Sequence, residues 1–424
     1  MDKLLILGAS KGTAQLIDTA HARGVWTTLA GPEGWSRPLD SFGADEVWVV
    51  NTTDLDTLER KCRESGVRGV LCGVSQFNTE NVLALTKRLG LSCYCTPDAW
   101  QYTVNKRAFK DLCIRSGVPV ARDFAPNGVP TDEELELIEY PVVVKATDLS
   151  ANRGMSFCNT KEEVVAACEL ALSVSNRDKV IIEKMMRGRE YTAHYALADG
   201  EASLVNFCAM FHEPGYPVNC YSVTTTATDR LPQYLAEVDA PFVRALKAGG
   251  AVEGVAWLEL MLDDDGHFYV LEMGYRMSGD LWALPMRDVC GFDTYDWLID
   301  VALGKKHTVA DLPAPQRAIP ERCGMTYILW SEHEGTIADI TGLEEVAAMD
   351  GVFVDSALCV GDHVSAHAYM VVITMCAGDY REAESIVRKI NDVVSIVDEN
   401  GEGLVIKFSD FKALQSVAAC GLGA

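Results

Sequence analysis

Strand-like and helix-like segments alternate over the first hundred residues, and this alternation restricts the possible folds more than any other feature of the sequence. The apolar segment KLLILGAS, at residues 3–10, precedes a helical stretch from Thr13 to Arg23. Strands that alternate with helices are typical of an α/β protein with a parallel, doubly wound sheet, because each helix carries the chain back over the sheet. The other predicted elements here are the strands WTTLAG, EVWVV, GVLCGV and LSCYC and the helices around residues 55–65 and 78–90.

The first turn, GASKG, lies where a dinucleotide-binding protein carries its glycine-rich fingerprint. Only Gly8 and Gly12 are present, so the G-x-G-x-x-G pattern is missing, and no convincing acidic partner follows the second strand. We therefore expect no bound NAD. The turn is interpreted as a tight turn, or as the edge of a substrate site at the carboxyl ends of the strands.

The pattern becomes antiparallel in the middle of the chain. A strand, a loop and a second strand that begins near Met155 are predicted from Tyr140 onward. The antiparallel pattern starts at Tyr191, with a hairpin that carries Asp199-Gly200 in its turn. The proline-rich segment HTVADLPAPQRAIPE leads to a last unit with one clear helix, Tyr380–Val394. We expect a Rossmann-like domain at residues 1–100, a middle domain at 101–305 with a lid at about 118–188, and a C-terminal α+β domain at 306–424.

The composition limits the classes of ligand. The 424 residues carry a net charge of −24, so we expect no nucleic-acid partner, and an anionic small molecule would need locally gathered basic residues or metal ions. The segment MDKLLILGAS lacks the features of a signal peptide, and no apolar run approaches the length of a membrane span. The fourteen cysteines include no C-x-x-C pair and are interpreted as buried thiols. These features predict a cytoplasmic protein without a membrane partner.

One hairpin brings two acidic residues together. The stretch VAWLELMLDDDGHFYVLEMGYRMSGD, residues 255–280, has two apolar runs around an Asp-Gly pair. If Asp265-Gly266 is a two-residue loop, Glu259 on the first strand lies directly opposite Glu272 on the second. Their Cβ atoms would then be about 4.5–5.5 Å apart on one face. The apolar residues predicted to share this face are Val255, Trp257, Met261, Phe268 and Val270.

Two facing carboxylates on an apolar surface repel each other and are unfavourable to bury. A divalent cation between Glu259 and Glu272 removes both problems. Oxygen ligands of this kind suit Mg²⁺ (or Mn²⁺), which proteins usually hold with one or two carboxylates and the phosphates of a substrate. The hairpin therefore predicts a metal ion that carries a phosphate ligand.

Other segments could hold the rest of such a ligand. Lys145 ends the apolar strand VVVK, where a buried amine needs an anionic partner. The loop DLSANRG beyond it offers backbone N–H groups that could cover phosphates. Glu183 and Glu190 lie in IIEKMMRGREY. Taken singly, each signal also has an ordinary explanation as a turn or a surface charge.

Taken together, these segments resemble the ATP-grasp superfamily of carboxylate–amine ligases, over about residues 1–300 and more loosely to the end. EKMMRGREYT is very similar to the adenine-and-ribose strand of D-alanine–D-alanine ligases and biotin carboxylases, and RMSGD is most like amino-acid ligases that make dipeptides. The resemblance implies ATP and Mg²⁺ as cofactors. It also implies a Rossmann-like domain, a small lid, an antiparallel grasp domain and a C-terminal α+β unit.

The resemblance assigns roles residue by residue at the adenine end and the metal. It implies that Glu183 and the Lys184 backbone meet the adenine amino group, that the Met186 N–H meets a ring nitrogen, and that Glu190 meets the ribose hydroxyls. Glu259 and Glu272 match the metal-binding acids. The residues that match the phosphate and substrate groups are Lys106 and Lys145 (phosphates), Ser150, Asn152 and Gly154 (phosphate-covering loop), and Arg276 (acyl phosphate or substrate carboxylate).

The hairpin departs from the family at Gly274, where an asparagine that helps to bind a second Mg²⁺ is usual. The enzyme interpretation is that a carboxylate, activated by ATP as an acylphosphate, is coupled to an amine. Dipeptide ligase, purine-pathway ligase and biotin carboxylase stay open, as does a nucleotide-binding regulator without turnover. We expect small-molecule substrates and a homodimer. His194, His212 and Tyr221 are candidates to line the amine pocket.

Overall fold

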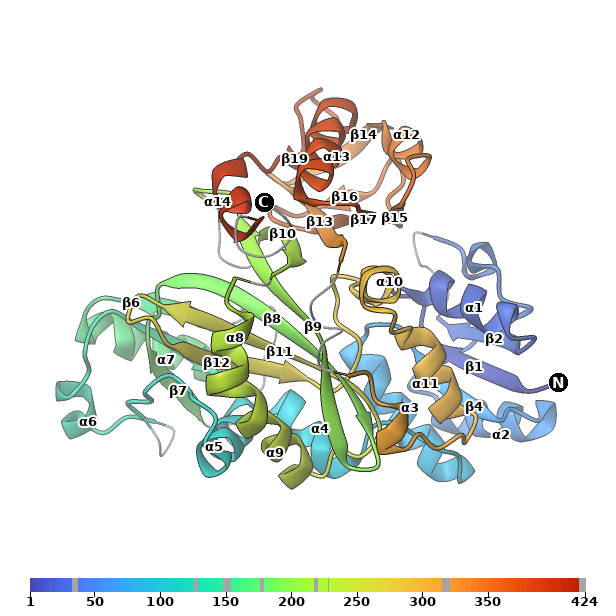
Figure 1. The fold of residues 1–424 in the computed structure, drawn as a ribbon, viewed down its shortest axis with the longest axis horizontal. Helices are drawn as coiled ribbons and strands as arrows, with labels where there is room; N and C mark the ends of the chain where they lie inside the picture. The colour runs from blue at the N-terminus through green and yellow to red at the C-terminus, as the bar shows by residue number, and fades with distance from the viewer. Residues whose placement is uncertain are drawn as a thin grey trace.

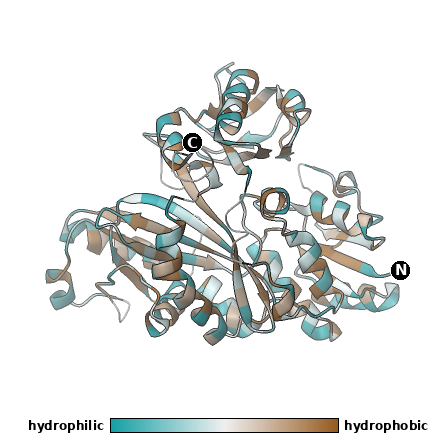
Figure 2. Ribbon diagram, viewed as in Figure 1, coloured by the Kyte–Doolittle hydropathy of each residue, from teal (hydrophilic) through white to brown (hydrophobic). Residues whose placement is uncertain are grey.

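The computed structural model describes residues 1–32, 37–125, 129–147, 154–175, 179–216, 220–227, 229–314 and 321–418. Figure 1 shows the N-terminal domain at one end, a small lid at the other, a long antiparallel sheet between them, and the C-terminal unit above that sheet. Figure 2 shows apolar residues along strands such as β1. Within the described ranges, no helix has the length and apolar character needed to cross a membrane.

The N-terminal domain has the predicted parallel sheet, with strand order β3-β2-β1-β4. Its strands are β1 (Lys3–Leu7), β2 (Trp26–Gly31), β3 (Glu46–Val49) and β4 (Gly69–Cys72), and its helices are α1 (Thr13–Ala22), α2 (Leu55–Ser65) and α3 (Gln76–Leu89).

The prediction of a strand for LSCYC, residues 91–95, is wrong. This segment pairs with no described strand: the Leu91 N–H bonds the Thr86 carbonyl at the end of α3, and the Tyr94 carbonyl bonds a residue of the middle part of the chain. The Tyr275 hydroxyl donates a hydrogen bond of 2.9 Å to the Tyr94 carbonyl, and the two rings meet edge to face at 6.1 Å. Thr96 then caps the next helix, α4 (Pro97–Val104).

The lid is a three-stranded antiparallel sheet, β6-β5-β7, covered by α7 (Lys161–Val174). It consists of β5 (Val142–Ala146), β6 (Met155–Cys158) and β7 (Val180–Lys184), preceded by α6 (Asp132–Glu136). Val142, Val144 and Ile182 pack with Val164 and Ala171 of α7 in a core of their own. Because this core is separate from the main one, the lid is a distinct packed body.

A long, largely antiparallel sheet runs through the middle and C-terminal parts of the chain, in the order β12-β11-β8-β9-β10-β13-β17-β15. The turn between β8 (Gly188–Ala198) and β9 (Glu201–His212) contains Asp199 at φ 52° and Gly200 at φ 75°, as an Asp-Gly hairpin turn requires. The other strands are β10 (Tyr221–Thr226), β11 (Gly254–Asp263), β12 (Phe268–Gly274), β13 (Cys323–Ser331), β15 (Val352–Ser356) and β17 (Tyr369–Ala377).

The C-terminal part is joined to the middle part by the pairing of β10 with β13. Helix α13 (Tyr380–Val393) packs its apolar face on this sheet and ends one residue before its predicted end. The remaining elements are α5 (Lys106–Ser116), α8 (Leu231–Tyr234), α9 (Ala240–Ala248), α10 (Ala283–Pro285), α11 (Thr294–Ala302), α12 (Leu343–Ala347), α14 (Phe411–Ala418), β14 (Gly335–Thr341), β16 (His363–Val364), β18 (Ser395–Asp398) and β19 (Val405–Ile406).

Candidate functional site

A cavity of about 620 Å³ lies between the lid and the long sheet. Its volume is within the range of small-molecule and cofactor sites, about 300–1,000 Å³. The lid contributes Val143, Lys145, Met155, Phe157, Glu183, Lys184, Met185 and Met186; the long sheet and α5 contribute Lys106, Glu190, Met210, Tyr221, Glu259, Met261, Leu271 and Glu272; the C-terminal part contributes Trp330, His367 and Tyr369.

The hairpin that carries the two acids pairs Glu259 with Glu272, as predicted, but its loop is longer than predicted. The Asp263 N–H bonds the His267 carbonyl at 3.0 Å, so three residues, not two, form the loop. The extra residue is compensated by an irregularity after Glu259, where Leu260 pairs with Val270 and Leu271 is left without a partner on β11. A bulge of this kind restores the register of the carboxylates.

The same bulge makes the prediction for Phe268 and Val270 wrong. Both pair with leucines of β11 and are buried in the main core, on the opposite face from Glu272. The alternation of faces is interrupted at Leu271, so strand residues before and after it point to opposite sides. Glu259 and Glu272 therefore face the cavity, next to Met261 and Leu271.

The electrostatics of the two carboxylates favour a cation. The Nζ atom of Lys106 lies 2.6 Å from Oε2 of Glu272 and offsets the effect of burial, so the pKa of Glu272 is lowered. Burial and the neighbouring charge of Glu272 raise the pKa of Glu259 well above its ordinary value. Glu259 has no hydrogen-bond or ion-pair partner among the described residues. The two carboxylates together form only one ion pair, that of Glu272 with Lys106, and their remaining oxygens suit a divalent metal ion.

A second charged group lies where the lid meets α5. Glu183 accepts a hydrogen bond of 2.9 Å from Lys145 on Oε2 and one from Lys110 on Oε1. Burial would raise the pKa of Glu183, but the two ammonium groups outweigh it and lower this pKa to about 2. Lys145 also lines the cavity. Lys110 was missed in the sequence, although it lies four residues after Lys106 and thus on the same helix face.

The residues predicted at the adenine end, Glu183, Lys184, Met186 and Glu190, all line the cavity, and Glu183 is bound to the predicted phosphate lysine, Lys145. The Met185 N–H is bonded to the Pro141 carbonyl at 3.0 Å, while no partner of the Met186 N–H is found in the described ranges. The Lys184 ammonium bonds Asp263 at 2.7 Å. His212 contacts Glu190 at 3.0 Å. Their roles toward a nucleotide stay predictions.

The predicted phosphate-covering loop falls mostly outside the described residues, which include neither Ser150 nor Asn152. Gly154 is described. It has φ 67°, and its carbonyl accepts a hydrogen bond of 3.2 Å from the Ala146 N–H. Gly154 thus begins the return of the chain into β6, beside the strand that carries Lys145.

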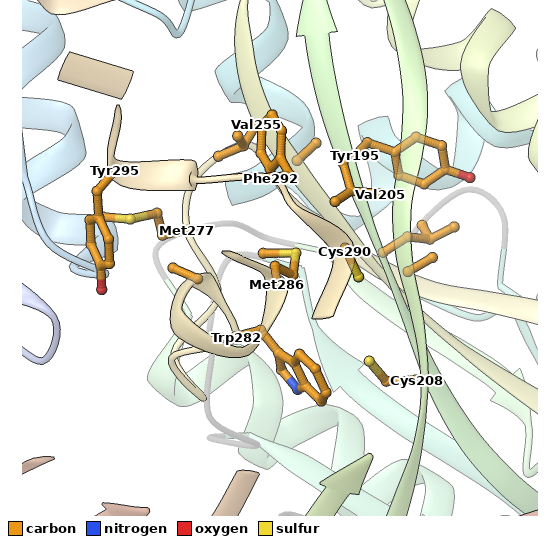
Figure 3. Close-up of a cluster of buried hydrophobic side chains, with 14 of the residues drawn as sticks. Tyr195, Val205, Cys208, Val255, Met277, Trp282, Met286, Cys290, Phe292 and Tyr295 are labelled. Carbon is orange, nitrogen blue, oxygen red and sulfur yellow. The ribbon is translucent and has the colours of Figure 1, made fainter. Parts of the chain in front are cut away.

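Arg276 lies next to the acidic pair. Its Nη1 donates to the Met277 carbonyl at 2.7 Å, and its guanidinium lies over the Trp257 ring at 5.1 Å. Burial lowers the pKa of Arg276. Figure 3 shows Met277, the residue after Arg276, in a cluster of buried apolar side chains with Trp282 and Met286.

Trp257 explains the glycine at position 274. The two residues are paired across β11 and β12. A Cβ atom added to Gly274 would lie 2.2 Å from Cε2 and 2.4 Å from Nε1 of the Trp257 indole. No side chain fits at such distances. The indole therefore occupies the place in which the usual asparagine of the family would stand, and it also supports Arg276 from one side.

The three candidates for an amine pocket are separated by the structure. Tyr221 lines the large cavity, and His212 lies beside it through its contact with Glu190. His194 is buried next to Ser278, at 3.3 Å, and lines a separate cavity of about 20 Å³. Burial lowers the pKa of His194 to about 3, so the ring is neutral. The cavity residues Trp330, His367 and Tyr369 were missed, because only the tertiary fold brings the C-terminal part here.

Residues 105–309 match the family described as the ATP binding domain of the carbamoyl-phosphate synthase L chain. The chain is 25% identical over 409 residues to a phosphoribosylamine–glycine ligase of Xylella fastidiosa, covering 90% of this chain and 91% of the relative. A similar ligase of Phenylobacterium zucineum is 26% identical, with 64% of this chain and 66% of the relative covered. The matched segment spans only 26% of a carbamoyl phosphate synthase large chain of Thermoanaerobacter pseudethanolicus, at 24% identity over 62% of this chain.

Two solved structures share the fold. The L-amino acid ligase from Bacillus licheniformis has a TM-score of 0.77 at 19% identity, covering 94% of this chain and 99% of that one. The biotin carboxylase domain of 2-oxoglutarate carboxylase from Hydrogenobacter thermophilus, described in complex with MgADP and bicarbonate, has a TM-score of 0.74 at 17% identity, with 95% and 91% covered.

Proposed function

We propose that the chain is an ATP-grasp ligase, which activates a carboxylate with ATP and couples it to an amine, releasing ADP and phosphate. The carrying observation is the large cavity, which is lined by the paired acids and by the three lysines Lys106, Lys145 and Lys184. Arg276, four residues after Glu272, lines the smaller cavity of His194. Such a site suits a metal-bound nucleotide beside an anionic substrate.

Each group has a proposed task. Glu259 and Glu272 would hold Mg²⁺ (or Mn²⁺), which when bound would offset charge on the phosphate oxygens. Lys106 and Lys145 would bind the phosphates. In the first step the substrate carboxylate attacks the γ-phosphorus of ATP, the bond between this phosphorus and ADP breaks, and an acylphosphate forms. In the second step the amine adds to the acyl carbon and phosphate leaves. Arg276 donates to the oxygen that becomes negative in this second step.

We propose amino acids as the substrates, with dipeptide-type amide formation. The segment RMSGD, which contains Arg276, and the fold shared with an L-amino acid ligase support this choice. A purine-pathway ligase is the second candidate, because the similarity to a phosphoribosylamine–glycine ligase extends over nine tenths of both chains. A homodimer and a cytoplasmic location remain predictions from the sequence.

The test is ADP release by the purified protein with Mg-ATP and a panel of substrates. ADP and an amide product that form only with two amino acids support the dipeptide-type ligase. ADP formed with glycine and phosphoribosylamine favours the second candidate. Bicarbonate-dependent ATP cleavage without any amino acid favours a carboxylase. Tight ATP binding without turnover in any mixture would identify a nucleotide-binding regulator and overturn the proposal.

A further inference from the structure

Glu183 is shared by two lysines that come from different elements and bind different oxygens of its carboxylate. Lys145, on β5, binds Oε2 and lines the large cavity. Lys110, on α5, binds Oε1, and it lines only a small recess, which Lys145 and Glu183 also line. Only 5% of the Lys110 side chain is exposed, and it lines none of the large cavity. Lys110 therefore reaches a ligand in the cavity only through Glu183.

Lys110 changes the charge of this group. Lys145 and Glu183 alone would form a neutral ion pair, in which the negative charge of the carboxylate would balance the positive charge of one ammonium group. With Lys110 the three side chains carry a net charge of +1. The two ammonium groups also repel each other, so Lys145 is bound less strongly to Glu183 than in a simple pair. Of the two lysines, only Lys145 lines the large cavity, so Lys145 presents the net positive charge of the group to a ligand there.

The position of Lys110 is rigidly supported. Its neighbour Arg107, one turn earlier on α5, donates to the carbonyls of Ala125 and Val180 at 2.9 Å each and forms an ion pair with Asp123. These contacts attach α5 directly to the start of β7, the strand of Glu183. A buried ion group of this kind adds little stability compared with apolar side chains of similar volume. The presence of this group is better explained by a task at the adjacent site.

We propose that Lys110 is a positioning residue of the nucleotide site: by holding Glu183, it leaves Lys145 with the positive charge that a nucleotide phosphate requires. The inference rests on the ATP-binding part of the proposed function. It concerns a residue that touches neither the nucleotide nor the metal, and it predicts an effect only on ligands that carry the phosphates.

The experiment uses calorimetry with Mg²⁺ to measure how the wild type and four variants bind a non-hydrolysable ATP analogue and adenosine. Lys110→Met should bind the analogue at least roughly tenfold more weakly and adenosine as the wild type does, because only the phosphates meet Lys145. Lys110→Arg should retain wild-type affinity. In Lys110→Met/Glu183→Gln the competing carboxylate is gone, so the affinity for the analogue relative to that for adenosine should return to the wild-type ratio. The ratio cancels any change at the adenine contact that the resemblance assigns to Glu183. Lys161→Met, which removes an exposed lid lysine paired with Glu136, is the matched control.

The double variant protects the test against misfolding, because a merely damaged site would not recover when a second change is added. Wild-type affinity of Lys110→Met for the analogue would overturn the proposal, and so would a double variant whose ratio stays as low as that of the single one. Equal weakening toward adenosine would show a purely structural role and overturn it as well. Failure of the wild type to bind the analogue at all would instead contradict the proposed function.

Discussion

Lys106 places its ammonium nitrogen 2.6 Å from the Oε2 atom of Glu272, the same carboxylate that faces Glu259 across the hairpin. Among the described residues, Lys106 is the only one that forms an ion pair with either acid. A metal ion held by the two acids, as proposed, would take the place of this ammonium on Glu272 and would leave Lys106 free to bind a phosphate.

Glu272→Gln should lose nucleotide-dependent metal binding while the protein stays folded, because the amide keeps the shape and still accepts from Lys106 but lacks the charge. Bound Mn²⁺ is counted by electron paramagnetic resonance in the presence of ADP, and folding is followed by thermal unfolding. Glu64→Gln, at an exposed position on α2, is the control. Undiminished Mn²⁺ binding by Glu272→Gln would disprove the metal site.

Metal binding should release a proton. Burial and Glu272 raise the pKa of Glu259, so the metal-free carboxyl binds its proton more tightly than an ordinary glutamate. A metal ion must displace that proton, and affinity should therefore rise with pH until Glu259 is ionised without metal. Calorimetry of MgADP binding in two buffers of different ionisation enthalpy measures the proton count. Equal heats in both buffers would contradict the prediction.

Gly274→Ala should destabilise the protein by about 1–3 kcal/mol through overpacking, because the added methyl group meets the Trp257 indole. The effect should be much smaller when Trp257→Ala is already present, since the space is then open. Urea unfolding of the two single variants and the double variant gives the coupling energy. The control is Gly403→Ala, where an added Cβ meets nothing within 4 Å and the backbone, as at Gly274, is outside the positive-φ region. Additive changes would show that the two residues do not compete for space.

Asp280→Asn should stabilise the protein at neutral pH by roughly 1–3 kcal/mol. Burial raises the pKa of Asp280 to about 6, above its ordinary 3.8. The folded state thus binds this proton more tightly than the unfolded state, so the wild type loses stability as pH rises from about 4 to about 6. The variant should lack that loss. Chemical unfolding at several pH values measures it, and identical pH profiles would refute the assignment.

Arg276→Lys should lower amide formation roughly 100-fold, with a modest loss of ATP affinity. Lysine keeps the charge but loses the planar fork that grips two oxygens at once, and it loses the stacking on Trp257. Coupled product is followed by mass spectrometry and nucleotide affinity by calorimetry. Wild-type amide formation in this variant would remove Arg276 from the proposed reaction.

The sequence by itself determined the elements whose evidence is local. Alternating polarity and turn residues identified the parallel N-terminal sheet, the Asp199-Gly200 hairpin and the pairing of Glu259 with Glu272, because period and turn chemistry act between near neighbours in the chain. They did not reveal the bulge at Leu271, since a longer loop and a bulge compensate each other and leave the predicted pair unchanged.

Only the tertiary structure decided which groups far apart in the sequence form ion pairs and which compete for the same space. Lys110 meets Glu183 across 73 positions, and Lys106 meets Glu272 across 166. Gly274 is explained by an indole on another strand, and the Tyr94 carbonyl, expected in a strand, bonds a tyrosine hydroxyl 181 positions away. Such contacts depend on packing geometry, which residue order does not encode locally, and so both the charge of the candidate site and the reason for its unusual glycine became visible only in three dimensions.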